Sequence, residues 1–197
     1  MRPTTLYLIR HAQSDPAVQE DRTRPLTPEG LRDTRIITAC LRERGITHIL
    51  SSPYERTLQT VAHLAETLAL PIETDERFRE RDAGGWHGDS FLAFVRAQWQ
   101  DFGYTAPGGE TLAQVQRRNV EAIRHAMGKY TGQTLALATH GTAMSTILNH
   151  YDPTWGYESF LRILNMMPCV IRLQIDAADR LMACEEILMV HKQWRKP

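Results

Sequence analysis

Two histidines in this sequence come directly after short apolar segments. Arg10 and His11 follow the run at residues 6–9, and His140 follows the segment TLALAT at residues 134–139. An imidazole can act as a nucleophile, acid or base near neutral pH, and a guanidinium pairs with phosphate or carboxylate oxygens. If these segments meet in space, their side chains suit chemistry on an anionic substrate.

A third polar group has the same placement. Ser51 and Ser52 follow the segment ITHIL at residues 46–50, which is expected to be a strand, and Arg56 lies about one helical turn further along the chain. Taken alone, Arg10 or Arg56 is typical of a solvated surface charge, and His140 of a hydrogen-bonded core histidine. Their occurrence together, each at the end of an apolar segment, is what favours a functional site.

The apolar segments that precede these residues predict buried strands. Residues 6–9 form a short apolar run rich in strand formers, and the segments at 46–50 and 134–139 are also predicted to be strands. A helix is predicted over 28–44, with Thr27 as its cap, Pro28 at its first position and Gly45 at its end. The alternation of strand and helix indicates an α/β sheet.

The remaining segments complete this architecture. Further helices are predicted from the segment at 51–53 to residue 68, over 91–99, over 110–127 and over 141–148, with a charged, glycine-rich loop at 75–89 and an edge hairpin at 170–175 and 181–187. The predicted fold class is α/β, a three-layer α/β/α sandwich with a mostly parallel central sheet, in one domain over residues 1–197. In such sheets ligands bind beyond the carboxyl ends of the strands, where the histidines and serines are expected to meet.

The composition excludes several other classes. Hydrophobic residues make up 42% and charged residues 23% of the 197, and 23 Lys and Arg balance 23 Asp and Glu. No overall field would attract nucleic acid or an anionic membrane. No run approaches the roughly 18 apolar residues of a membrane span, no signal-peptide core is present, and Cys40, Cys169 and Cys184 lack metal-binding spacing. We therefore expect a cytoplasmic protein with reduced cysteines, no metal, no cofactor, and neither nucleic acid nor membrane as a partner.

Five motifs occur in a characteristic order. They are LIRHAQS, SSPYERTLQT, ERFRERDAGGWHG, PGGET and LATHG. Together they resemble the histidine phosphatase (phosphoglycerate mutase-like) superfamily, over roughly residues 5–142 of the chain. The resemblance implies the phosphoglycerate mutase-like form of the α/β fold.

The resemblance also implies catalytic roles. His11 matches the nucleophile that attacks phosphorus, Arg10 and Arg56 match the arginines that bind the phosphoryl oxygens, and His140 matches a second histidine that donates to those oxygens. Glu80 matches the acid that protonates the leaving group and then activates water. An arginine-lined site of this kind stabilises the charge of phosphoryl transfer without a metal ion.

Residues on the substrate side are matched in the same way. Those expected to border the phosphate or substrate are Gln13, Ser14, Gly141, Thr142, Arg22 and Trp86, with Arg24, Glu110 and Thr111 as further candidates. Backbone N–H groups after Gly141, at a helix N-terminus, are expected to add to the anion site. The alternatives are that Trp86 serves packing and that Glu110 only begins a helix.

Two positions depart from the family pattern. Ala12 stands where glycine is usual, and Ala17 stands where many members have an asparagine that assists phosphate binding. Alanine disfavours a positive φ and places a Cβ beside the phosphate. Because of these departures, a non-catalytic module that only binds phosphate remains an alternative function for this chain.

Within the superfamily the choice is between hydrolase and mutase. Mutases of the family resemble one another in longer chains and in an asparagine- and tryptophan-rich segment after the nucleophile, whereas this chain has SDPAVQEDRTRPLTPEG. Its GGWHG segment is similar to that of alpha-ribazole and broad-specificity phosphatases. We expect a metal-independent phosphomonoester hydrolase of the phosphatase branch, acting through a phosphohistidine on a small phosphorylated metabolite and binding phosphate ion. A phosphoglycerate mutase-type phosphotransferase is the alternative, and a homodimer is left open.

Overall fold

The computed structural model describes residues 2–85 and 87–192 and contains a six-stranded sheet in the order β3-β2-β4-β1-β5-β6. The strands are β1 (Thr4–Arg10), β2 (His48–Ser51), β3 (Ile72–Thr74), β4 (Thr134–Thr139), β5 (Met166–Ile175) and β6 (Leu181–His191). The pairs β3–β2, β2–β4 and β4–β1 are parallel, and β5 and β6 add an antiparallel edge. The predicted mostly parallel sheet with a C-terminal edge hairpin is confirmed.

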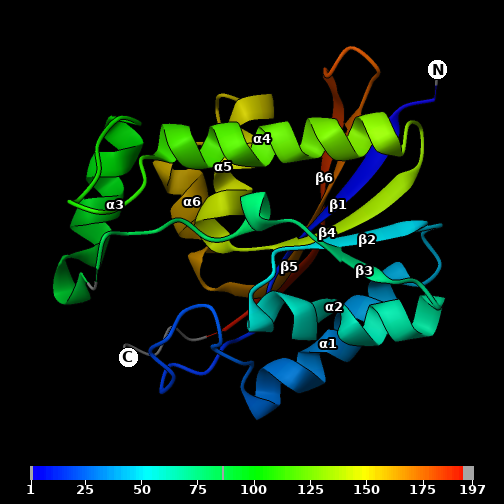
Figure 1. Ribbon diagram of the computed structural model, residues 1–197, viewed down its shortest axis with the longest axis horizontal. Helices are drawn as coiled ribbons and strands as arrows, with labels where there is room; N and C mark the ends of the chain where they lie inside the picture. The colour runs from blue at the N-terminus through cyan, green and yellow to red at the C-terminus, as the bar shows by residue number, and fades with distance from the viewer. Residues whose placement is uncertain (1, 86, 193–197) are drawn as a thin grey trace.

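Helices cover both faces of the sheet. They are α1 (Pro28–Leu41), α2 (Glu55–Leu68), α3 (Phe91–Gln100), α4 (Leu112–Lys129), α5 (Gly141–Tyr151) and α6 (Tyr157–Leu164), with short 3₁₀ turns η1 (Glu76–Phe78) and η2 (Gly88–Ser90). Figure 1 shows α1 and α2 on one face of the sheet and α4 and α5 on the opposite face. This is the predicted three-layer α/β/α sandwich. Within the described part of the chain, no helix is long and apolar enough to cross a membrane.

The central strands hold the layers together because they are apolar on both faces. Along β1, Leu6 and Leu8 belong to the core beneath α4 and α5, while Tyr7 and Ile9 belong to the core beneath α1 and α2. This division follows from the alternation of side chains along a strand. Each fully buried side chain of this size contributes about 1.5–3 kcal/mol to folding, so the strand ends that carry the site are firmly placed.

The predicted start of the first helix is confirmed. The Thr27 hydroxyl accepts a hydrogen bond from the Gly30 amide, and Pro28 opens α1. Helix α1 ends at Leu41, three residues before the predicted end, and Gly45 has a φ of 68° in the turn that follows.

The sequence prediction missed two elements. Strand β3 has three residues, of which only Ile72 is apolar, and α6 is an eight-residue helix. The C-terminal strands are also longer than predicted, and α2 begins at Glu55. The segment 79–87, within the predicted loop, has neither helix nor strand among its described residues.

Candidate active site

The carboxyl ends of the three central parallel strands meet at one place, as the sequence predicts. Arg10 ends β1 and His11 follows it, while His140 follows β4 as the N-cap of α5. The His11 amide donates to the Thr139 carbonyl at 3.0 Å, and the Ser52 amide donates to the Ala138 carbonyl at 2.9 Å. The rings of His11 and His140 lie 5.4 Å apart between their centroids. The strand register therefore fixes how these groups approach one another.

His11 is held in the form that a nucleophile needs. Its Nδ1 lies 2.7 Å from the carbonyl oxygen of Ala12, which can only accept a hydrogen bond, so the proton sits on Nδ1 and the lone pair on Nε2. The residue is buried, and burial together with the charges of Arg56 and Arg10 holds the pKa of His11 well below its ordinary 6.5. The ring is therefore neutral at pH 7, with Nε2 free to attack an electrophile.

His140 has one ring nitrogen engaged and one available. Its Nε2 lies 2.9 Å from the Ser52 hydroxyl, and its buried Nδ1 has no hydrogen-bond partner among the described residues. Burial first, and then the charge of Arg56, lowers the pKa of His140 well below its ordinary value. A buried ring nitrogen without a partner is uncommon, and here it is the atom that an oxyanion could meet.

Arg10 is fixed by main-chain oxygens. Its Nη1 donates to the carbonyls of Ile163, Leu164 and Met166, the last two at 2.9 and 3.3 Å, while its buried Nε has no partner among the described residues. A Cβ on Gly141 would lie 3.2 Å from the guanidinium carbon of Arg10. Gly141 therefore lets this arginine approach the start of α5.

Arg56 is buried at the start of α2 and contacts the loop that precedes α1. Its guanidinium donates to the backbone carbonyl of Asp21 and lies 3.2 Å from an oxygen of the Asp21 carboxylate. Only 3% of its surface is exposed. The structure thus brings a second permanent positive charge close enough to His11 to lower that residue's pKa.

Glu80 approaches from the irregular segment and is bound at the N-terminus of α5. Its carboxylate accepts hydrogen bonds from the amides of Thr142 and Ala143, both at 3.1 Å, and from its neighbour Arg81 at 2.8 Å. A carboxylate is favoured at a helix N-terminus. The amides after Gly141, expected to face a bound anion, thus donate to Glu80 in this structure.

The expected substrate-side residues are more dispersed. The side-chain oxygen of Gln13 accepts from the Thr27 hydroxyl at 3.0 Å, and Ser14 forms an isolated bridge with Leu26. Arg22 is exposed and pairs with both carboxylate oxygens of Glu76 at 2.9 and 2.8 Å. Trp86 lies outside the described residues. The binding roles of these residues, and of Thr142, stay predictions.

Tyr54 was not singled out from the sequence, although it lies inside the SSPYERTLQT motif. Its ring centroid is 5.1 Å from that of His140 and 5.0 Å from the guanidinium carbon of Arg56. Arg22 lies over the same ring at 5.6 Å. Its position in the sequence between Ser52 and Arg56, two predicted site residues, could have identified Tyr54 as a candidate.

The two departures from the family pattern are accommodated in the structure. Ala12 is fully buried, its φ is not positive, and its amide donates to the Thr60 hydroxyl at 3.0 Å. Ala17 is exposed, and its amide donates to the Asp15 carboxylate at 2.9 Å. An alanine at position 12 therefore causes no backbone strain.

Comparison with known proteins agrees with this geometry. The sequence is 31% identical, over 157 residues, to the "Probable phosphoglycerate mutase GpmB" of Yersinia pestis (strain Pestoides F), covering 73% of each chain. The structure is similar to that of Bacillus stearothermophilus YhfR, with a TM-score of 0.75, 26% identity and coverage of 91% of this chain and 95% of the other. It shares its fold with mycobacterial glucosyl-3-phosphoglycerate phosphatase in complex with VO3, with a TM-score of 0.74, 19% identity and coverage of 92% and 97%.

The family-level comparison covers most of the chain. The sequence pattern described as "Histidine phosphatase superfamily (branch 1)" matches residues 6–183, a range that includes His11, Arg56, Glu80 and His140. This match and the 31% identity agree with the motifs and with the meeting of the strand ends. The chain therefore belongs to the histidine phosphatase superfamily, branch 1.

Proposed function

We propose that this protein is a metal-independent phosphomonoester hydrolase that acts on a small phosphorylated metabolite through a phosphohistidine at His11. The observation that carries the proposal is the neutral His11 ring, whose Nδ1–H is bound by the Ala12 carbonyl so that the lone pair lies on Nε2. Arg10 and Arg56 supply fixed positive charge beside it. These are the requirements for attack on a phosphate ester.

In the first step, the Nε2 lone pair of His11 forms a bond to phosphorus. The bond from phosphorus to the ester oxygen breaks, and its electron pair stays on that oxygen. Glu80, in its acid form, delivers a proton to the leaving oxygen. Arg10, Arg56 and the Nδ1 of His140 would stabilise the charge on the three equatorial oxygens.

In the second step, water attacks the phosphorus of the phosphohistidine. Glu80, now a carboxylate, accepts a proton from the water. The bond from nitrogen to phosphorus breaks, its electrons return to Nε2, and inorganic phosphate leaves. One carboxyl group thus serves both steps, because the second step is the reverse of the first with water in place of the alcohol.

The burial of the site supports a small substrate. His11 is 7% exposed and Arg56 is 3% exposed, so little of the proposed nucleophile or of this arginine is open to solvent. Free Cys40, Cys169 and Cys184 and the balanced charge are in keeping with a reduced, cytoplasmic setting. The burial of His11 favours a small phosphorylated metabolite over a phosphoprotein as the substrate.

A phosphoglycerate mutase is the second candidate, because a relative 31% identical to this chain carries that name. Hydrolysis is favoured by the length of the chain, by the composition of the segment after His11, which is not rich in asparagine and tryptophan, and by the GGWHG motif. Among the structural neighbours, the mycobacterial glucosyl-3-phosphoglycerate phosphatase is named as a phosphatase.

The test measures both activities on the same preparation. The protein is incubated with an aryl phosphate in the presence of a metal chelator. Separately, it is incubated with 3-phosphoglycerate and a catalytic amount of 2,3-bisphosphoglycerate, which supplies the phosphoryl group that a mutase must carry on its histidine. We expect release of inorganic phosphate from the aryl ester. Conversion of 3-phosphoglycerate to its 2-isomer in preference to phosphate release would establish the mutase, and phosphate binding without turnover of any ester in a metabolite panel would establish a non-catalytic module.

A further inference from the structure

Glu80, the proposed acid and base, lies on an irregular segment of the backbone. Residues 79–83 belong to no helix, strand or 3₁₀ turn. The Arg79 amide donates to the Glu76 carbonyl at 3.1 Å and the Asp82 carbonyl accepts from the Glu110 amide at 2.8 Å, but neither bond involves the backbone of Glu80 itself. The Glu80 carboxylate is held by α5. The placement of its main chain must come from other contacts.

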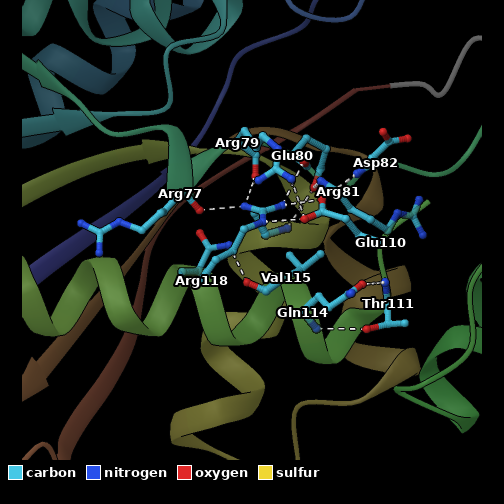
Figure 2. A network of polar contacts seen from close by, with 12 residues as sticks. Arg77, Arg79, Glu80, Arg81, Asp82, Glu110, Thr111, Gln114, Val115 and Arg118 are labelled. Atoms are coloured by element: carbon cyan, nitrogen blue, oxygen red, sulfur yellow. Dashed lines mark hydrogen bonds and ion pairs between the residues drawn. The ribbon is translucent and has the colours of Figure 1, made fainter. Parts of the chain in front are cut away.

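Arg118, on α4, supplies those contacts. Its Nη1 donates to the carbonyls of Arg77 and Arg79 at 2.7 and 2.8 Å, and its Nη2 donates to the carbonyl of Glu80 at 3.1 Å. Figure 2 shows the guanidinium of Arg118 directed into the turn formed by these residues. One side chain thus binds three carbonyls of the segment that bears the acid.

Glu110 completes the arrangement from the other side. Its two carboxylate oxygens accept from Nε and Nη2 of Arg118, each at 3.0 Å. The same carboxylate accepts from the Asp82 amide at 3.0 Å and from the Arg79 guanidinium at 2.7 Å. Arg118 and Glu110 therefore bind Glu80 itself and residues on both sides of it in the chain, at positions 77, 79 and 82.

The helix behind this pair is a firm support. Helix α4 has a capping box between Thr111 and Gln114 and buries Leu112 and Val115. Gln116 on the same helix donates to the Thr146 carbonyl of α5 at 3.0 Å. The backbone of Glu80 is thus fixed to α4 and its carboxylate to α5, two helices joined to each other.

We propose that Arg118, paired with Glu110, is a positioning residue that sets where the Glu80 carboxyl lies relative to the leaving group. This inference rests on the proposed role of Glu80 as acid and base. Its consequence is specific: loss of Arg118 impairs proton transfer while the approach of His11 to phosphorus is kept. Binding of phosphate through Arg10 and Arg56 is also kept.

The experiment compares esters of differing leaving-group basicity. For wild type, Glu80→Gln and Arg118→Gln, kcat/KM is measured on a series from activated aryl to alkyl phosphates. A poor leaving group needs the proton and an activated one does not, so we expect Arg118→Gln to slow alkyl esters about 10²-fold and activated aryl esters only a few-fold. Arg118→Lys should restore part of the loss, because it keeps the charge but not the planar fork.

The control is Arg124→Gln on the same helix. Arg124 pairs with Asp179 at 2.6 Å and is half-exposed, so this variant also loses an ion pair of α4 but leaves Glu80 untouched. It should leave the dependence on leaving-group basicity unchanged. Should Arg118→Gln fail to fold, as judged by circular dichroism, Glu110→Gln provides the same test with a smaller change.

The double variant separates positioning from general damage. If Arg118 acts through Glu80, Arg118→Gln adds little on alkyl esters once Glu80→Gln is present. Equal slowing of all esters by Arg118→Gln, or additive losses in the double variant, would overturn the inference. The proposed function would still stand if Glu80→Gln makes kcat/KM depend more steeply on leaving-group basicity. If Glu80→Gln leaves the dependence of kcat/KM on leaving-group basicity unchanged, Glu80 is not the acid, and the inference about Arg118 fails as well.

Discussion

The two halves of the active site are built in different ways. His11, Arg10 and His140 lie at the ends of β1 and β4, where residues 5–10 of β1 pair in parallel with residues 134–139 of β4. Glu80 lies on an irregular segment that side chains of α4 and amides of α5 hold in place. The proposed nucleophile, His11, is therefore positioned by the sheet, whereas the proposed acid, Glu80, is positioned by individual hydrogen bonds.

This difference separates what substitutions should do. Removing a group on the sheet side changes the chemistry but leaves the backbone beneath it in place. Removing a contact on the acid side moves the acid. The two kinds of damage can be told apart by whether phosphate binding or leaving-group dependence changes.

The largest effect is expected from His11→Ala. The variant loses the atom that attacks phosphorus, so turnover should fall by about 10³-fold or more. Phosphate should still bind, because Arg10, Arg56 and His140 remain, and isothermal titration calorimetry measures that binding. Near-normal turnover would show that another group is the nucleophile.

A smaller effect is expected from Arg56→Lys. Lysine keeps the charge but loses the planar fork that pairs with two phosphoryl oxygens, so kcat/KM should fall about 10²-fold. The matched control is Arg172→Lys, since Arg172 pairs with Glu185 at 2.8 Å in the antiparallel edge of the sheet and is not a candidate site residue. Equal losses in the two variants would contradict the assignment of Arg56.

The charge state of His11 is the next point of comparison. Burial, Arg56 and Arg10 lower its pKa, so the ring should stay neutral as the pH falls through its ordinary value of about 6.5. Nitrogen NMR of histidine-labelled protein measures this directly. Arg56→Gln removes a positive neighbour and should raise the pKa of His11, whereas Arg56→Lys should raise it less. A wild-type ring that protonates at or above its ordinary value would contradict the electrostatic account.

The same shift predicts how stability depends on pH. The unfolded chain binds protons on its histidines below about pH 6.5, whereas buried His11 and His140 stay neutral in the folded protein. The unfolding free energy should therefore fall as the pH is lowered, by about 1.4 kcal/mol per pH unit for each such histidine while its folded form remains neutral. Urea denaturation at a series of pH values checks this, and His140→Asn should reduce the slope.

The smallest effect is expected from Ala12→Gly, which restores the residue usual in the family. Ala12 has no positive φ and causes no strain, so glycine gains nothing in the folded state and adds freedom to the unfolded chain. Stability should fall by about 0.4–1 kcal/mol, measured by urea denaturation, with little change in kcat/KM. A large gain in activity would mean that the alanine side chain hinders phosphate binding.

The sheet half of the site could be predicted from the sequence. The strands that carry Arg10 and His140 are short apolar runs that end at charged or polar residues, and parallel strands end at one edge of a sheet. The apolar pattern therefore predicts both the strand and the position of the polar residues at its end. The tautomer of His11 could not be predicted, because it depends on the carbonyl of Ala12.

The acid half could be predicted only in part. Glu80 was matched through its motif, but the support from Arg118 was not foreseen, because its partners are mainly backbone carbonyls, which have no sequence signature. Strand β3 was missed for a related reason: it has one apolar residue and lies at the edge of the sheet. Edge and loop structure depends on contacts between distant residues more than on local patterns.

The most direct test of the central claim is to trap the covalent intermediate. Protein carrying Glu80→Gln, in which the second step should be slowed, is mixed with a labelled aryl phosphate and denatured at alkaline pH, and the modified residue is located by mass spectrometry. We expect one phosphoryl group on His11, which chases to inorganic phosphate as turnover proceeds. Label on another residue, or steady turnover with no labelled protein, would contradict a mechanism that passes through His11.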